Sequence, residues 1–192
     1  LTMMIEKGMS FDEALKIAQE KGYAEKDPTA DVEGHDACRK VCILASLAFG
    51  KHVYPNQVET EWITNITLED VSYIENAGGV IKLLGQIKYI NDNEIAAFVS
   101  PAVVYNGSQL ASVKDVFNAI LVRGDAVGDV CFYGPGAGKL PTASAVVADI
   151  IDCAKHSERK KIFGWGAGNE DYVVDYKERI EMPFYVRAKA TP

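Results

Sequence analysis

The sequence predicts an α+β fold: a mixed, largely antiparallel β-sheet with helices packed on one face. Helical patterns fill the first 50 residues, two pairs of strand-like segments follow, and a further helical pattern comes after residue 140. Hydrophobic residues make up 48% of the 192 residues, so the chain can bury a core of its own as about one domain.

The first helical region covers residues 1–21, where apolar side chains recur at helical spacing. Ser10 and Glu13 have the spacing of a capping box, in which each side chain accepts from the other residue's backbone N–H. Gly22 is expected to end this region, because glycine adopts the left-handed conformation that terminates many helices.

A second helix is expected from Asp31 or Gly34 to about Phe49, and a glycine again follows its end. Residues 51–66 have the pattern of a connector with some strand character. A short helix is predicted within residues 67–79, where Thr-Leu-Glu-Asp opens the segment and two glycines close it.

Two hairpins are predicted next. Residues 80–90 and 95–105 have strand patterns around an Asn-Asp-Asn turn, and residues 117–122 are expected to pair with residues 130–133. The many strand-like segments joined by short turns are the reason for expecting a largely antiparallel sheet.

A last helix is predicted over residues 141–156, after a glycine-rich run. Its apolar stripe, expected to be buried, consists of Ala143, Val146, Val147, Ile150 and Ile151. Residues 157–170 are polar and glycine-rich, which favours a linker or mobile loop, and the tail returns to a strand pattern. We therefore divide the chain into a domain at 1–156 and a linker with a strand at 157–192.

Composition excludes several classes of protein. The net charge of -7 argues against nucleic-acid binding, which needs clustered Lys and Arg. No apolar stretch approaches the roughly 20 residues of a membrane span, and no signal peptide is recognisable. The four cysteines form no CxxC pair and are expected to be reduced and buried, so a cytoplasmic location is predicted. Both ends read as the interior of an element, which suggests a piece of a longer protein.

An acidic loop leads into the second helix. Its carboxylates are Glu25, Asp27, Asp31, Glu33 and Asp36. Such a loop attracts an ammonium group or a cation and repels an anion. The alternative is that Asp31 caps the helix and the other carboxylates are solvated.

Lys40 is the residue that this alternative does not explain. It lies four residues after Asp36, so the two share one helix face, and an apolar run follows it. A lysine that is desolvated in such a place must be paired, and it can then move a proton. We therefore predict that Lys40 and Asp36 act together in a site.

The glycine-rich run at 134–138 is a second candidate, because exposed N–H groups at a helix start bind phosphate, carboxylate or amide oxygen. Its spacing fits neither a P-loop nor a dinucleotide fingerprint, and a tight strand-to-helix turn is the simpler alternative. His35, Cys38 and Cys42 lack a fourth ligand at a familiar spacing, so no metal site is predicted.

These residues together resemble the substrate-binding and dimerisation domain of homoserine dehydrogenase. The resemblance lies in Gly-Tyr-Ala-Glu at 22–25, Asp-Pro at 27–28, Asp31, Gly-x-Asp at 34–36 and Arg-Lys at 39–40. A second block is Gly-Pro-Gly-Ala-Gly at 134–138 with Pro-Thr-Ala at 141–143. The resemblance as a whole extends over about residues 1–156.

The resemblance implies an oxidoreductase that interconverts L-homoserine and L-aspartate 4-semialdehyde with NADP or NAD, in threonine and methionine biosynthesis. It implies that Lys40, with Asp36, moves the proton of the substrate oxygen. The residues it implies for substrate binding are Glu25, Asp31, Asp36 and Tyr23. Those it implies near the cofactor are Gly22, Glu25, Gly136 and Gly138. It also implies a homodimer formed through the sheet.

The chain departs from the family pattern in two respects. Trp62 stands where the family usually has glycine, which would strain the backbone if that position had a positive φ. The nucleotide-binding domain is not recognisable in the sequence, so the cofactor would be bound mainly outside this chain and the chain alone is expected to be inactive. The tail at 180–192 resembles the approach to an ACT-type domain. The alternatives are a non-catalytic dimerisation domain and an amino-acid-binding module.

Overall fold

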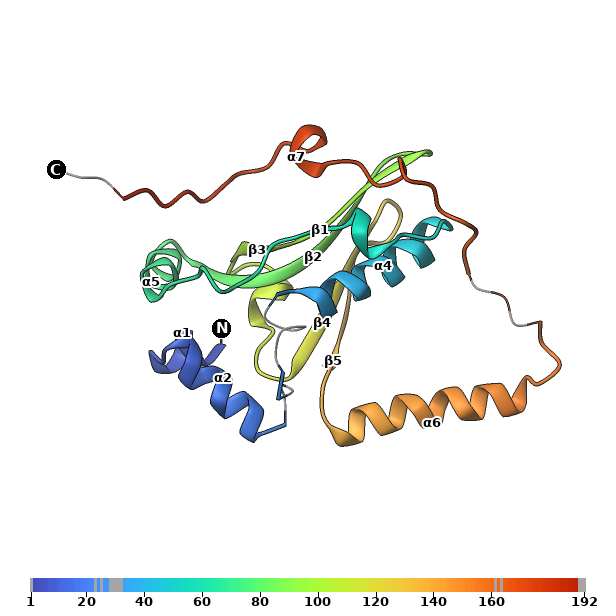
Figure 1. The fold of residues 1–192 in the computed structure, drawn as a ribbon, viewed down its shortest axis with the longest axis horizontal. Helices are drawn as coiled ribbons and strands as arrows, with labels where there is room; N and C mark the ends of the chain where they lie inside the picture. Colours follow the sequence, from blue (N-terminus) through green and yellow to red (C-terminus); the bar gives the residue numbers. More distant parts are fainter. Residues whose placement is uncertain are drawn as a thin grey trace.

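A computed structural model describes residues 2–22, 24, 26–27, 33–160, 162 and 164–189 (Figure 1). It consists of helices around a three-stranded sheet of order β1-β3-β2, with a separate two-stranded sheet formed by β4 and β5. The predicted α+β class is confirmed.

The N-terminal helical region is two helices, α1 (Thr2–Lys7) and α2 (Phe11–Glu20), separated by Gly8 at φ +60°. The predicted capping box is present at α2: Ser10 Oγ accepts from the Glu13 N–H, and the Glu13 carboxylate accepts from the Ser10 N–H. The cap explains why the second helix begins where it does.

Helix α4 (His35–Phe49) lies between two glycines, as predicted. Gly34 has φ +76° and Gly50 has φ +71°, both in the left-handed region. Gly50 donates its N–H to the Ser46 carbonyl and so closes the last turn. One face of this helix is buried, and that face consists of Cys38, Val41, Cys42, Ala45 and Ser46.

The central sheet is built on the predicted hairpin of β2 (Gly79–Asn91) and β3 (Glu94–Tyr105). The two strands are antiparallel, from Gly79 opposite Tyr105 to Asn91 opposite Glu94. The short strand β1 (Glu59–Thr60) pairs in parallel with β3, after the 3₁₀ turn η1 (Pro55–Gln57). The parallel pair was not predicted.

Strand β3 is buried on both faces. Ile95, Ala97 and Val99 face the cluster that contains the buried side of α4, whereas Ala96 and Phe98 pack with Tyr176 on the opposite face. Close packing also requires a glycine opposite α4, because a Cβ at Gly85 would lie 2.2 Å from Val41 Cγ2.

Helix α5 (Leu68–Asn76) starts at the predicted Thr67 and packs on β2, with Val71 and Ile74 buried against Ile81. The 3₁₀ turn η2 (Gln109–Ser112) follows β3 and contacts both long strands. Trp62 precedes α5 without a positive φ, so the strain considered for this position is absent.

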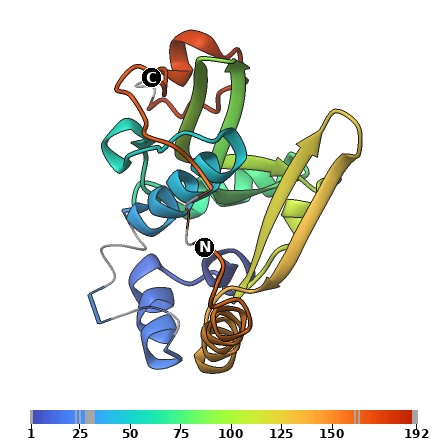
Figure 2. The same cartoon turned by 90° about the vertical axis from the view of Figure 1, so that its right-hand side faces the viewer.

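The second predicted hairpin is β4 (Phe117–Gly124) with β5 (Gly128–Pro135), followed by α6 (Lys139–Lys155). Figure 1 and Figure 2 show α6 set apart from the central sheet. The expectation that its apolar stripe is buried was wrong within the described chain: α6 has no buried residue, and Val146, Val147, Ile150 and Ile151 are all exposed. The helix pattern correctly predicted an apolar stripe, but no described residue buries it.

The segment from residue 164 onward packs against the sheet, and we call residues 164–176 the strap. Gly166 exchanges hydrogen bonds with Gly50 and His52, and Ile95 exchanges them with Tyr172 and Val174. Tyr172 is buried, and so is Tyr176, which opens the short helix α7 (Tyr176–Arg179) and stacks on Phe98 at 3.9 Å. Residues beyond 156 therefore contribute to the core, and those that do so lie in the tail whose sequence has a strand pattern.

Candidate active site

The start of α4 packs closely against the central sheet. Gly34 is buried there, and a Cβ at this position would lie 2.8 Å from Thr60 Cγ2 and 3.7 Å from Val99 Cγ1. Its φ of +76° and this close approach both favour glycine. The beginning of the helix is thus fixed relative to β1 and β3.

Asp36 and Lys40 form the predicted pair one turn into α4. Lys40 Nζ lies 2.6 Å from Asp36 Oδ2. Asp36 is in the first helical turn, where the helix dipole favours a carboxylate. The side chains are 46% and 58% exposed for Asp36 and Lys40, so the expectation that Lys40 is desolvated was wrong within the described residues. Val41, Cys42 and Ala45 after Lys40 face the sheet, but Lys40 itself lies on the opposite side of the helix.

The exposed face of α4 is unusually apolar beside this pair. Ile43 follows Lys40 by three residues and Leu47 follows Ile43 by four, so both lie on the face of Lys40, and they are 52% and 55% exposed. Leu47 approaches the strap, because a Cβ at Gly164 would be 3.3 Å from its Cδ2. An ion pair bordered by exposed aliphatic side chains is typical of a surface that another structure covers.

Glu33 and His35 form a side-chain contact that the sequence did not predict, with His35 Nε2 3.2 Å from Glu33 Oε2. It lies just before the Asp36–Lys40 pair and is exposed. Glu33 therefore orients a neighbouring side chain at the start of α4. The spacing of two residues carries no helical signal, which is why sequence reasoning missed it.

The remaining substrate residues from the sequence, Tyr23, Glu25 and Asp31, lie outside the described residues. Gly22 is described: it has φ +71° just after α2, and no atom of another described residue lies within 4 Å of a Cβ built there. Its position is open on the side that a side chain would occupy.

The glycine-rich run has a structural explanation at each of its two predicted site residues. A Cβ at Gly136 would lie 1.9 Å from Asn118 Nδ2, and the Gly136 N–H donates to the Val116 carbonyl. Gly138 has φ +115° at the start of α6. Figures 1 and 2 show α6 away from α4, so the described chain does not bring the two predicted halves of the site together.

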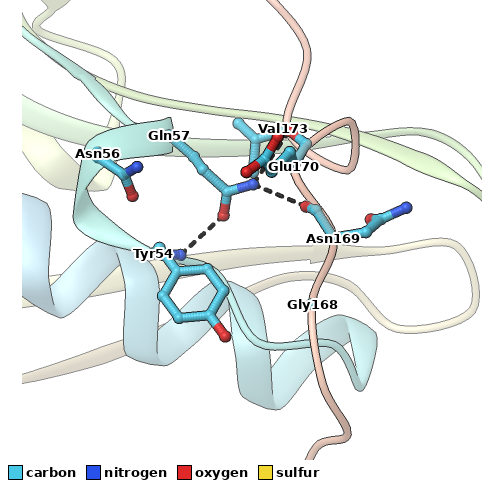
Figure 3. Close-up of a pocket in the computed structure, with 7 residues that line it drawn as sticks. All are labelled: Tyr54, Asn56, Gln57, Gly168, Asn169, Glu170 and Val173. Atoms are coloured by element: carbon cyan, nitrogen blue, oxygen red, sulfur yellow. Dashed lines mark hydrogen bonds between the residues drawn. The ribbon is translucent and has the colours of Figure 1, made fainter.

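A hollow of about 570 Å³ lies elsewhere, between η1 and the strap (Figure 3). Gln57 joins the two sides of this hollow. The Gln57 Nε2 donates to the carbonyls of Asn169 at 2.8 Å and Glu170 at 3.2 Å, and the Gln57 Oε1 accepts from the Tyr54 N–H. None of the predicted site residues lines it. Its polar groups serve mainly to attach the strap.

Two further searches cover the described part of the chain. There, no three His, Cys, Asp or Glu side chains gather in a way that could hold a metal ion. Nor is any described helix long and apolar enough to cross a membrane.

Comparison with known proteins finds the relatives of this chain among the dehydrogenases. The family model of homoserine dehydrogenase matches residues 1–151. The chain therefore belongs to the homoserine dehydrogenase family, and the resemblance stated from its two sequence blocks is confirmed.

The relatives are longer than this chain. Homoserine dehydrogenase of Bacillus subtilis is 44% identical over 156 residues, which is 81% of this chain and 36% of the relative. That of Pseudomonas aeruginosa is 44% identical over 196 residues, or 99% of this chain and 45% of the relative. The chain thus spans less than half the length of these relatives.

Solved structures agree. A homoserine dehydrogenase of Staphylococcus aureus at pH 7.5 has a TM-score of 0.75 at 44% identity, over 83% of this chain and 39% of that one. One from Thiobacillus denitrificans has a TM-score of 0.76 at 42% identity, over 91% of this chain and 41% of that one. The latter similarity reaches beyond residue 156, and so includes part of the segment from residue 164 onward.

Proposed function

We propose that this chain is the substrate-binding part of a homoserine dehydrogenase that interconverts L-homoserine and L-aspartate 4-semialdehyde with NADP or NAD. The observation that carries the proposal is the Asp36–Lys40 pair, placed on an open helix face in a chain of this family. A positioned lysine beside a carboxylate suits a reaction in which a hydroxyl gains or loses a proton.

Lys40 is proposed to move the proton of the substrate oxygen, and Asp36 to hold Lys40 in place through the 2.6 Å contact. When a nicotinamide cofactor is bound, it supplies the hydride chemistry at the carbon that bears this oxygen. Gly34 supports the pair, because it fixes the first turn of α4 against Thr60.

Tyr23, Glu25 and Asp31 are proposed to bind the substrate with Asp36. Homoserine carries an ammonium group, which accounts for the excess of carboxylates in the loop before α4. Its own carboxylate would be repelled there and must be bound by other groups.

Gly22, Glu25, Gly136 and Gly138 are proposed to lie near the cofactor. The fit of the described residues is partial: the open side of Gly22 allows a close approach, whereas Asn118 fills the space beside Gly136. These few groups are too sparse to bind a dinucleotide, which supports the proposal that the cofactor is bound mainly by chain outside these 192 residues. Turnover by this chain alone is therefore not expected.

The exposed apolar surfaces support a larger enzyme around this chain. Ile43 and Leu47 border the Asp36–Lys40 pair, and α6 carries an apolar stripe with no described partner. The additional length of the relatives is enough to cover both surfaces. Covering the face of α4 would exclude water from the reacting atoms.

A second function, formation of a homodimer through the sheet, rests on the β4–β5 hairpin. An isolated two-stranded hairpin is marginally stable in water. This one exposes apolar side chains: Phe117, Ile120, Val122, Val130, Phe132 and Tyr133. A second copy that extends or covers this hairpin would bury them, as the non-catalytic dimerisation alternative also requires.

The proposed compartment is the cytoplasm, and the proposed pathways are those of threonine and methionine. The described cysteines support a reducing compartment, because Cys38, Cys42, Cys131 and Cys153 are all unpaired thiols.

The test uses the complete enzyme that carries this chain. Lys40→Ala is expected to reduce kcat for homoserine oxidation by at least about 100-fold, the range that general acid–base catalysis contributes, with cofactor affinity unchanged. Asp36→Asn is measured in the same assay. Its matched control is Asp152→Asn, because Asp152 forms another exposed i,i+4 pair, with His156. Near-wild-type activity of Lys40→Ala would show that Lys40 does not move the proton.

Calorimetry of the same enzyme distinguishes the amino-acid-binding alternative. Homoserine should bind, whereas the analogue with a hydroxyl in place of the amino group should not. Equal binding of the two would contradict the role of the acidic loop. Binding of homoserine without any turnover would favour a binding module over an enzyme.

A further inference from the structure

Asp70 is a buried carboxylate that the proposed chemistry does not use. Its residue is 3% exposed, and it is the only charged residue among the buried ones in the described chain. Burying a carboxylate is costly unless hydrogen bonds and opposite charge replace its water. Its partners therefore indicate what the burial is for.

Two of the partners are local. Asp70 Oδ2 accepts from the Thr67 N–H at 2.8 Å and from Thr67 Oγ1 at 2.9 Å, which completes the capping box of α5. The capping box of α2 has the same chemistry, but its Glu13 carboxylate is exposed and, within the described chain, accepts hydrogen bonds from Ser10 alone. Capping by itself thus does not require a buried acid.

The other two partners come from the far end of the chain. Tyr185 Oη donates to Asp70 Oδ1 at 2.9 Å. Arg187 Nη1 donates to Asp70 Oδ2 and, at 2.7 Å, to Thr67 Oγ1. The Tyr185 ring also lies 5.9 Å from the ring of Tyr73, one turn further along α5. The burial of Asp70 therefore depends on contacts with the C-terminal segment.

Residues 183–189 are extended, and their side chains alternate. Tyr185 and Arg187 are two residues apart and both reach Asp70. Phe184 and Val186, on the alternate positions, are 66% and 79% exposed. Within the described chain no backbone hydrogen bond joins these residues to a strand. Their attachment therefore depends on side chains that converge on one carboxylate.

We propose that Asp70 anchors an intramolecular latch. In this latch, Tyr185 and Arg187 bind Asp70 and so hold residues 183–189 against α5. The latch can open without unfolding α5. Opening of the latch is separable from unfolding of α5, because Thr67 still caps this helix when Tyr185 and Arg187 leave Asp70. The latch would set the direction in which the C-terminal segment leaves the domain.

The charges around the latch agree with a closed state at neutral pH. Desolvation raises the pKa of Asp70, but hydrogen bonds from Thr67 and Tyr185 and the charge of Arg187 outweigh it, and the net pKa is lowered. The hydrogen bond to Asp70 raises the pKa of Tyr185, so the phenol keeps its proton.

Limited proteolysis of the 192-residue chain with chymotrypsin tests the latch, because Phe184 and Tyr185 are cleavage sites within the held segment. Arg187→Gln is expected to increase the rate of cleavage after Phe184 at least tenfold. Arg179→Gln is the matched control, because Arg179 pairs with Glu94 outside the latch, and it should change the rate less than twofold.

Amide hydrogen exchange of α5 gives the second readout. In Arg187→Gln, protection of the α5 amides should stay within twofold of wild type, although cleavage after Phe184 becomes faster. An unchanged cleavage rate in Arg187→Gln would overturn the proposal. Loss of α5 protection together with the faster cleavage would also overturn it, since the contact would then be part of one cooperative unit.

Discussion

The substitution Gly34→Ala tests whether the start of α4 is set by contact with β1. Gly34 combines a left-handed backbone, φ +76°, with a Cβ position only 2.8 Å from Thr60 Cγ2. The backbone conformation costs an alanine about 1–2 kcal/mol, and overpacking adds about 1–3 kcal/mol. We expect a total loss of about 2–5 kcal/mol in the free energy of unfolding.

Gly50→Ala provides the matched control at the other end of the same helix. Gly50 has φ +71°, and no atom lies within 4 Å of a Cβ built there. Only the backbone cost applies, so we expect a loss of about 1–2 kcal/mol. The difference between the two variants isolates the contact with Thr60.

Urea unfolding followed by circular dichroism measures both losses. The double variant Gly34→Ala with Thr60→Ser removes the clashing methyl group, while serine can keep the hydrogen bond from position 60 to the Val58 carbonyl. It should recover to the level of Gly50→Ala. If Gly34→Ala were no worse than Gly50→Ala, or if Thr60→Ser gave no recovery, the packing argument for this end of α4 would be wrong.

Two further predictions concern association and acid stability. Phe132→Lys, at an exposed position of β5, should shift the complete enzyme from dimer to monomer in sedimentation velocity. Val127→Lys, in the β4–β5 turn, is the control and should leave the dimer intact. A dimer that persists in Phe132→Lys would contradict the hairpin interface. The lowered pKa of Asp70 means that its contribution to stability is present above its unfolded pKa of about 3.9 and is lost as the pH falls through the folded value. Asp70→Asn should therefore reduce stability at pH 7 and flatten its acid dependence below about pH 4; an unchanged acid limb in thermal unfolding would refute this.

The limits of the helices and hairpins could be predicted because their signals are local. Gly34 and Gly50 delimit α4, the Ser10 cap starts α2, and the turn between β2 and β3 lies where its polar residues indicated. Capping and turn formation involve groups a few residues apart, so a single sequence contains both partners. For the same reason the spacing of Asp36 and Lys40 predicted their contact.

The environment of Lys40 could not be predicted in this way. A helix with one apolar face has two sides, and only packing decides which side a polar residue takes. The sheet covers Cys38, Val41 and Cys42, and this leaves Lys40 on the open face. The same limit applies to α6, whose stripe is amphipathic in sequence but exposed in the described chain.

By itself, the sequence determined the α+β class, the family, the C-terminal end of α4 and the pairing of Asp36 with Lys40. Only the tertiary structure decided that β1 joins β3 in parallel, that Val174 and Tyr176 of the strap pack on the second face of the sheet, and that Asp70 meets Arg187. These contacts join residues about 40 to 120 positions apart. Their partners are selected by the burial of whole surfaces, which no short pattern in the sequence records.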